Sequence, residues 1–316
     1  MGKFSHPRRG SRQFAPRNRA KSEVPRIRTW VQKEGKAVLG FAGYKVAMTH
    51  AALVENNPKS ILVNQSRQEP ITLIQVPPVK VIGVRYYLQE KSVGQAFAPN
   101  LHKDLGRTVR PLPKAGKAPK EVQNFDRAVI IVSMQPRLAG IGKKKPEIME
   151  IALAGSSPDE QKAKALELLG TDLRASDVLS VGDYLDIFAV SKGRGFLGPV
   201  ARMNVPLMSV KTKRSRRRPA NIGSWRPKRV LWQTPMGGKT GYHQRCDYNK
   251  RIVAISQGDG SPFHKYGKVD GDVILLHGSI PGPIKRLVRM RFAARVPERV
   301  FDPQKIDGIA TGGIKL

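Results

Sequence analysis

The chain has 316 residues, of which 40% are hydrophobic, and carries a formal net charge of +33. This length permits one large domain or two ordinary ones, with enough apolar residues for a real core. A surface this positive repels itself unless a polyanion neutralises it, so nucleic acid is the leading partner class. The single cysteine, Cys246, excludes an internal disulfide and a multi-cysteine metal framework, and it fits a reducing compartment.

A membrane is the weaker alternative partner. The sequence has no run of about 18 apolar residues and no basic amphipathic helix. Residues 1–29 also lack the apolar core of a signal peptide. We therefore expect a cytoplasmic protein that has no membrane partner.

The N-terminal arm, residues 1–35, is rich in Arg and Pro. Its first 29 residues contain nine basic residues and one acid, Glu23. Arg suits phosphate forks and base stacking better than Lys does. We expect the arm to be extended and to become ordered only against a partner, with a solvated tail as the alternative. The RNA-binding residues predicted here are Arg8, Arg9, Arg12, Arg17, Arg19, Arg26 and Arg28.

From residue 36 the composition changes to that of a folded body. Gly40 and Gly43 suggest a tight backbone, and we expect two strands around a turn, at 38–45 and 50–55. Apolar, β-branched runs predict further strands, with a corner at Pro77 and Pro78 between the first two. These strands are 69–76, 79–88, 127–135, 147–152, 181–190, 251–256, 273–277 and 287–292.

The strongest helix signal spans residues 157–170. Ser157 can cap it, Pro158 occupies the first helical position and Glu160 completes a capping box, while Gly170 ends it. Residues 100–122 are polar and predicted to be irregular. The fold class is mainly β with an α+β insertion. The predicted segments are 1–35 as the N-terminal arm, 79–175 as the insertion and 211–251 as a loop. The three parts of the body are 36–78, 176–210 and 252–316, the last of which includes the C-terminal tail.

The basic loop, residues 211–251, contains 13 basic residues and one acid, Asp247. It has no helical or alternating rhythm, yet it contains Trp225 and three other Trp or Tyr residues. Basic residues with interleaved aromatics in such a loop fit folded RNA. We expect Trp225 to stack on bases, although burial in a core is the usual fate of Trp. The RNA-binding residues predicted here are Lys211, Lys213, Arg214, Arg216, Arg217, Arg218, Trp225, Arg226, Lys228, Arg229, Lys239, Tyr242, His243 and Arg245.

Two stretches resemble nucleotide-binding motifs but lack the required context. Residues 193–198 have the spacing G-x-G-x-x-G, but Pro199 and Pro206 disfavour the long helix that must follow. We interpret this stretch as a tight loop in which Lys192 and Arg194 face phosphates. Residues 238–240, GKT, resemble the end of a P-loop whose first glycine is missing.

No catalytic or metal-binding constellation is readable. His243 and Cys246 have metal-ligand chemistry, but two ligands do not make a site. No paired carboxylates and no nucleophile-elbow pattern occur. We predict that the protein is not an enzyme and that it has no metal, no cofactor and no small-molecule substrate. An rRNA- or tRNA-modifying enzyme and a DNA-compacting architectural protein remain the alternatives.

Several stretches resemble the universal large-subunit ribosomal protein L-three family in its archaeal and eukaryote-like form. They are KFSHPRRGS at 3–11, FAGYKVAMTH at 41–50, SKGRGFLGPVAR at 191–202, IGSWRPKRV at 222–230, GKTGYHQRCDYNKRI at 238–252 and GSIPGPIKRLVRMR at 278–291. The resemblance covers nearly the whole chain. One departure is Arg226, where eukaryotic relatives have His after the loop Trp.

The resemblance implies a translation-factor-like six-stranded β-barrel, an inserted α/β domain, a long basic N-terminal arm and a central finger loop. It further implies binding to large-subunit rRNA early in assembly, with neighbouring large-subunit ribosomal proteins as partners. The loop would reach toward the peptidyl-transferase centre with Trp225 at its tip. Localisation would be cytoplasmic, in the ribosome.

Overall fold

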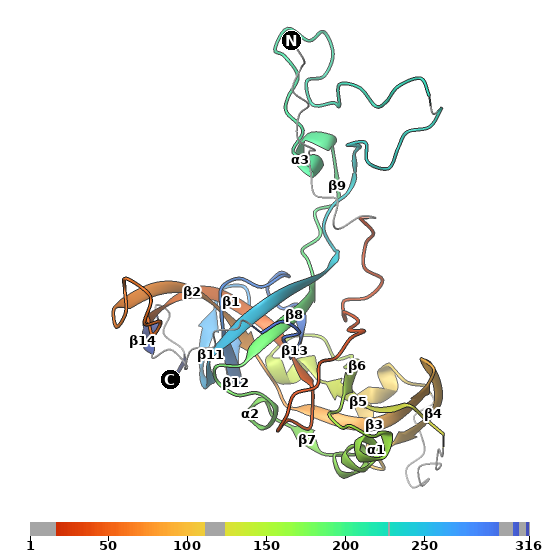
Figure 1. The fold of residues 1–316 in the computed structure, drawn as a ribbon, viewed down its shortest axis with the longest axis vertical. Helices are drawn as coiled ribbons and strands as arrows, with labels where there is room; N and C mark the ends of the chain where they lie inside the picture. The colour runs from red at the N-terminus through yellow and green to blue at the C-terminus, as the bar shows by residue number, and fades with distance from the viewer. Residues whose placement is uncertain (1–16, 111–123, 227, 297–305, 310–313, 316) are drawn as a thin grey trace. The chain divides into compact units, whose positions relative to one another are not determined.

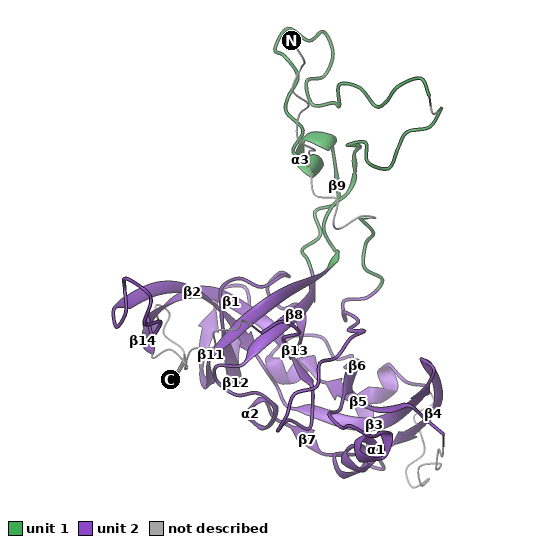
Figure 2. Ribbon diagram, viewed as in Figure 1, with its two compact units in different colours: residues 1–21, 191–244 green, residues 22–190, 245–316 purple. Residues whose placement is uncertain are grey.

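The computed structural model describes residues 17–110, 124–226, 228–296, 306–309 and 314–315 (Figure 1). The chain divides into two compact units (Figure 2). Unit 1 comprises Met1–Lys21 and Ser191–Gln244, and unit 2 comprises Ser22–Val190 and Arg245–Leu316. The described part contains far more strand than helix, so the fold is mainly β, as predicted.

The larger sheet follows an order that returns to its first strand. The order is β12 (Gly267–His277), β2 (Ser66–Gln75), β1 (Gly40–Val54), β13 (Leu287–Phe292), β8 (Tyr184–Val190) and β11 (Gln244–Phe263). β11 also pairs with β12. β14 (Ile306–Ile309) adds to β1, and β15 (Ile314–Lys315) adds to β11.

The interior of unit 2 is filled by aliphatic and aromatic side chains from these strands. Phe41, Leu73, Ile187 and Leu275 are each at most 1% exposed. Complete burial of such a side chain contributes about 1.5–3 kcal/mol to folding. The core therefore forms where the apolar runs of the sequence predicted strands.

β1 is one continuous strand of 15 residues, so the prediction of two strands around a turn was wrong. Gly40 and Gly43 lie within the first of the two predicted strands, where they allow close packing. A Cβ at Gly40 would lie 2.8 Å from the Trp30 ring, and one at Gly43 would lie 2.6 Å from Ile74 Cγ2. The register of β1 against β2 shifts between Lys45 and Ala47, which marks a bulge in place of the expected turn.

Unit 2 contains a second sheet. Its order is β4 (Lys91–Phe97), β3 (Val79–Leu88), β5 (Arg127–Met134) and β6 (Glu147–Ala152), with β7 (Asp172–Leu173) paired to β3. The predicted bounds of β3 and β6 are confirmed, as are those of β13 in the larger sheet. β4 was not predicted, because its sequence KSVGQAF is short and largely polar.

The helix α1 (Pro158–Glu167) packs on β5 and confirms the strongest helix prediction. The Ser157 hydroxyl accepts a hydrogen bond from the Glu160 amide at 3.3 Å. The Glu160 carboxylate accepts from the Ser156 amide at 3.1 Å, one residue earlier than a full capping box requires. Ala165 is completely buried, so this helix attaches to the sheet through a small residue.

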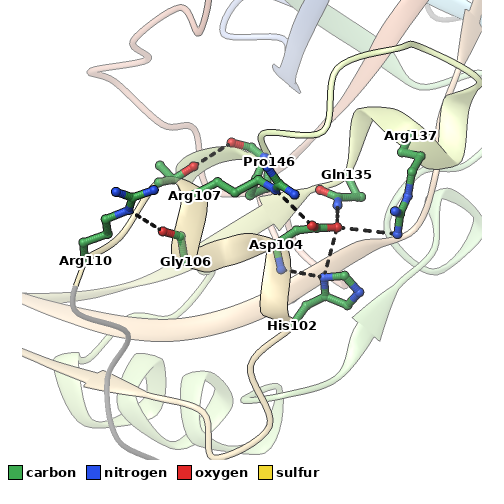
Figure 3. A network of polar contacts seen from close by, with 9 residues as sticks. His102, Asp104, Gly106, Arg107, Arg110, Gln135, Arg137 and Pro146 are labelled. Carbon is green, nitrogen blue, oxygen red and sulfur yellow. Dashed lines mark hydrogen bonds and ion pairs between the residues drawn. The ribbon is translucent and has the colours of Figure 1, made fainter.

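A polar network joins η1 (Lys103–Arg107) to η2 (Pro136–Ala139) (Figure 3). Asp104 accepts hydrogen bonds from Arg107 Nε at 3.2 Å and from Gln135 Nε2 at 2.7 Å, and Arg137 Nη2 lies 3.5 Å away. Partial burial would raise the pKa of Asp104. The hydrogen bond from Arg107 and the charges of Arg137 and His102 outweigh it, so this pKa lies below its ordinary value. The network is structural, because its one acid is already surrounded by its own cations.

Two buried arginines of β13 hold the later part of the N-terminal arm on the body. Arg289 Nη1 donates to the Pro25 carbonyl at 2.8 Å, and Arg291 Nη1 donates to the Thr29 carbonyl at 2.6 Å. Pro25 and Ile27 are buried, whereas the residues between and after them are exposed. Residues 22–30 are therefore packed on the protein itself, which differs from the expectation that the arm is ordered only against a partner.

Candidate nucleic-acid interface

The glycine-rich stretch at 193–198 forms one side of a two-stranded ribbon in unit 1. β9 (Phe196–Leu197) pairs with β10 (Gly238–Lys239). The residues next to this pair continue the ribbon. The Arg194 amide donates to the Thr240 carbonyl and the Thr240 amide donates to the Gly195 carbonyl, both at 2.9 Å. The Ser191 amide donates to the His243 carbonyl, also at 2.9 Å. The ribbon is the stem from which the basic loop departs and returns.

Gly241 is required where the two sides of this stem cross. Its φ is +78°, and a Cβ there would overlap the Lys192 carbonyl oxygen and lie 3.0 Å from Gly193 Cα. The helix that follows the glycine-rich stretch, α3 (Pro199–Met203), has only five residues. This structure differs from a dinucleotide-binding turn, which needs a long helix directly after the glycines.

His243 joins the N-terminal arm to the stem. Its Nδ1 donates to the Asn18 carbonyl at 2.7 Å, and its Nε2 accepts from the Gly241 amide at 3.1 Å. These two bonds require the neutral ring with its proton on Nδ1. The Ala20 amide adds a bond to the Tyr242 carbonyl at 2.7 Å. His243 is 7% exposed and both ring nitrogens are engaged, which differs from the expected direct contact with RNA.

Two further arginines hold unit 1 together from within. Arg202 donates through Nη1 to the Met236 carbonyl at 3.0 Å and through Nε to the Lys239 carbonyl at 3.2 Å. Arg17 Nη1 donates to the Arg202 carbonyl at 3.2 Å. Burial, together with the charge of Arg17, lowers the pKa of Arg202. Arg17 was predicted to contact RNA, and the structure shows it bonded inside unit 1.

Residues 19–21 of the N-terminal arm, the glycine-rich stretch and residues 239–242 enclose an open cleft of about 830 Å³, which we call the basic cleft. Its functional side chains are Arg19, Lys21, Phe196, Lys239 and Tyr242. No acid is among the described residues that line it, and Phe196 is 76% exposed. Cations of this kind contact phosphates, and exposed rings stack on bases. The cleft therefore has the chemistry of a nucleic-acid site.

The basic loop extends from this stem without a core of its own. No described residue between 200 and 242 is buried. Trp225 is 82% exposed, and the Lys228 ammonium lies 5.9 Å from the centre of its ring. Short-range bonds shape the loop, such as that from Thr234 Oγ1 to the Ile222 carbonyl at 3.3 Å. The last residues of the predicted loop, 244–251, belong to β11.

The remaining predicted site residues differ in their exposure and in the part of the chain that carries them. Arg8, Arg9 and Arg12 lie outside the described residues. Lys192 and Arg194 are exposed on the ribbon, and Arg26 and Arg28 are exposed on unit 2. Arg218 and Arg245 are partly buried. The exposed basic residues of the loop are Lys211, Lys213, Arg214, Arg216, Arg217, Arg226, Lys228 and Arg229.

The sequence analysis missed Lys21, Phe196 and Arg202. Lys21 stood in a basic arm in which only the arginines were selected. Phe196 was given no role within the glycine-rich motif, although an aromatic residue between glycines in a basic protein was an available signal. Arg202 was quoted only as part of a family motif, and nothing in the sequence placed it against residue 236.

The described residues contain no group of three or more His, Cys, Asp or Glu side chains able to hold a metal ion. Burial raises the pKa of the Cys246 thiol to about 11, so it is protonated at neutral pH and is a poor nucleophile. Among the described helices, none has the length and apolar character needed to cross a membrane.

Comparison with known proteins is consistent with this basic, RNA-suited chain. The family model for ribosomal protein L3 matches residues 1–117 and 114–308. The large ribosomal subunit protein uL3 of Methanothrix thermoacetophila is 41% identical over 96% of both chains. The uL3 proteins of Methanothermobacter thermautotrophicus and Methanopyrus kandleri are 38% and 40% identical over 98% and 92% of this chain, and over 98% and 86% of their own lengths. The chain belongs to the ribosomal protein L3 family.

Proposed function

We propose that the basic cleft and the basic loop bind large-subunit rRNA. The family makes this chain a structural, non-catalytic protein of the large ribosomal subunit. The observation that supports the site is the basic cleft, where three cations and two aromatic rings converge without an acid. Hydrogen bonds through His243 and Arg202 hold the three segments together, so the cleft is formed before RNA arrives.

The loop contributes differently, because it has no buried residue to fix it. Its cations neutralise phosphates that would otherwise repel one another, and burial between RNA helices supplies the packing that the protein does not. Such coupled ordering stiffens both partners and suits a role early in assembly. Trp225 has most of its surface exposed, and we propose that it stacks on bases near the peptidyl-transferase centre, as the family resemblance implies. Arg226, which follows it, adds a charge where eukaryotic relatives have His.

The larger sheet of unit 2 is proposed to be a six-stranded barrel of the translation-factor type. The support is its order from β12 through β2, β1, β13 and β8 to β11, together with the pairing of β11 with β12. The sheet of β3, β5 and β6 then represents the inserted α/β domain. We retain the predicted segment bounds as part of this proposal, and neighbouring large-subunit proteins as partners of the body.

The salt dependence of binding to an rRNA fragment tests the proposal. If about eight phosphates are neutralised, the log–log slope of affinity against salt is roughly −6 to −7. The double variant Lys21→Gln with Lys239→Gln should make this slope shallower by about 1.5–2. The matched control is Lys59→Gln with Lys103→Gln, which removes two exposed charges of unit 2. An affinity insensitive to salt, or one equal for duplex DNA, would contradict the proposal.

A further inference from the structure

One face of the inserted sheet in unit 2 is left partly open. On β3 and β5 the residues facing this side include Arg85, Tyr87, Arg127 and Val129. The residues between them face the other side, where Tyr86 and Ile130 are buried in the core. Strand alternation thus places cations, an aromatic ring and apolar surface together on the open face.

Residues 24–30 of the N-terminal arm form the opposite wall. Arg289 fixes this wall, because it donates to the Pro25 carbonyl and to the Glu150 carbonyl of β6. Its guanidinium also lies 5.9 Å from the centre of the Trp30 ring. Burial lowers the pKa of Arg289 to about 10, so it remains charged at neutral pH. Together the two walls enclose a cleft of about 770 Å³, which we call the sheet cleft.

The charges of the sheet cleft are unbalanced. The cleft is lined by five arginines and two acids, Glu90 and Glu150; the arginines are Arg26, Arg28, Arg85, Arg127 and Arg289. Glu150 is already engaged, because its carboxylate pairs with Arg85 and accepts from the Tyr87 hydroxyl at 2.9 Å. The exposed side chains of Arg26 and Arg28 add positive charge at the rim. The complementary ligand is therefore an anion.

The aromatic and apolar residues that line the sheet cleft indicate which kind of anionic ligand fits it. The Arg127 guanidinium lies 4.8 Å from the centre of the Tyr87 ring, so the two planes form a stacking platform. Trp30 stands on the facing wall, and Val129 belongs to an apolar floor. Flat bases with attached phosphates match this combination of planes and cations. A paired helix keeps its bases stacked on one another and cannot offer them to a platform of this kind.

We infer that the sheet cleft binds an unpaired stretch of RNA, with a base on the Arg127–Tyr87 platform and phosphates at Arg26 and Arg28. This inference rests on the proposed rRNA-binding function and gives it a second site, on unit 2, with a stated RNA structure. The N-terminal arm supplies cations to both sites, through residues 19 and 21 to the basic cleft and through residues 26 and 28 to the sheet cleft.

Trp30 is a built-in reporter for this site. The chain has three Trp residues, and Trp225 and Trp232 are exposed on the basic loop. The full-length variant with Trp225→Phe and Trp232→Phe therefore emits from Trp30 alone. A single-stranded oligouridylate with a fluorescent end label serves as the probe. Its anisotropy reports total binding to the chain, and the emission of Trp30 reports occupancy of the sheet cleft.

The expected result is quenching of Trp30 by the single-stranded probe. In the same background, Arg127→Gln and Tyr87→Leu should each move the midpoint of quenching about tenfold higher in RNA concentration. Tyr87→Phe keeps the ring but loses the hydroxyl that bonds to Glu150, so its midpoint should lie much closer to that of the parent than the midpoint of Tyr87→Leu does. Arg67→Gln removes an exposed charge of unit 2 outside the cleft, and it should also leave the midpoint unchanged.

Three results would overturn the inference while leaving the proposed function intact. The first is binding by anisotropy with no change in Trp30 emission. The second is equal quenching by a fully paired, blunt-ended RNA duplex of the same length. The third is a lower quenching midpoint for a polyglutamate peptide than for RNA, which would assign the cleft to an acidic protein. Loss of all binding in the anisotropy measurement would instead contradict the proposed function itself.

Discussion

Two glycines of the stem allow the cost of backbone strain to be measured apart from the cost of steric overlap. Gly195 and Gly241 both have left-handed φ values, +70° and +78°. No atom lies within 4 Å of a Cβ built on Gly195, whereas a Cβ on Gly241 overlaps the Lys192 carbonyl. Replacement by Ala should therefore cost backbone strain at Gly195, and both backbone strain and steric overlap at Gly241. Gly195→Ala should cost about 1–2 kcal/mol of local stability from backbone strain alone.

Gly241→Ala should open the stem, because the crossing strand must move as well. The measurement is amide hydrogen exchange at Arg194 and Thr240, whose amides bond across the ribbon. Exchange should accelerate much more in Gly241→Ala than in Gly195→Ala, with the unfolding of unit 2 unchanged in both. Equal acceleration in the two variants would show that overlap at the crossing is not what requires glycine.

Asp186 is a buried acid whose removal should be costly. It is completely buried, and its carboxylate accepts from Arg291 Nη2 at 2.9 Å and from the Ala294 amide at 3.1 Å. Asp186→Asn leaves the buried Arg291 charge without its counter-ion, which should lower the free energy of unfolding by about 3–5 kcal/mol in denaturant titration. Asp183→Asn is the control. Its partner Lys33 is 37% exposed, so the expected loss is about 0–1 kcal/mol. Similar losses in both would contradict this account.

At the residue scale, the sequence predicted the residue types that gather in the basic cleft better than it predicted the contacts of each residue. Arg19, Lys239 and Tyr242 of the basic cleft were predicted from charge and aromatic content. His243 was predicted to contact RNA, yet its ring bonds to Asn18 and Gly241. Such roles depend on contacts between segments about 225 residues apart, and neither periodicity nor composition reports those contacts.

At the scale of elements, the Asp104 network predicts a pH dependence of stability. The pKa of Asp104 is held below its ordinary value of 3.8 in the folded chain. A lowered folded-state pKa stabilises the fold above the unfolded value, and that stabilisation is lost as the pH falls through the folded value. Asp104→Asn should therefore lower the melting temperature at neutral pH, and its difference from the parent chain should shrink below about pH 4.

Thermal melts of both chains across this pH range provide the measurement. Asp159→Asn is a suitable comparison, because Asp159 lies in the first turn of α1 outside the network. A difference between Asp104→Asn and the parent that stays constant down to the lowest pH would show that the charge of Asp104 does not hold η1 to η2.

Elements with strong local signals were predicted well, and those fixed by tertiary pairing were not. The capped helix α1 and the apolar strands β3, β6 and β13 carry their information within one segment. In β1 the turn predicted between residues 45 and 50 is absent, because the strand takes up a register shift between Lys45 and Ala47 and continues to Val54. The early part of β11 is polar and belongs to the strand only through its partners, so it was assigned to the loop.

At the scale of the whole molecule, charge and burial are distributed in opposite ways. Most of the excess charge lies in the N-terminal arm and the basic loop, whereas the buried hydrophobic residues lie in unit 2. Unit 2 has its own core, and the described part of the loop has none.

We therefore expect the loop to be protected from proteolysis only when RNA is bound, with unit 2 resistant in both states. Limited proteolysis with and without an rRNA fragment checks this, and a loop equally resistant without RNA would contradict it.

The central claim is that unit 1 holds this chain on large-subunit rRNA. Its most direct test is sedimentation of the tagged chain from an archaeal host, with large subunits washed in high salt. The parent chain is expected to remain with the large subunit. A variant with Lys21→Gln, Phe196→Ala and Lys239→Gln should be released at lower salt, while Lys59→Gln with Lys103→Gln should be retained. Release of the parent chain, or retention of the triple variant at the same salt, would contradict the claim.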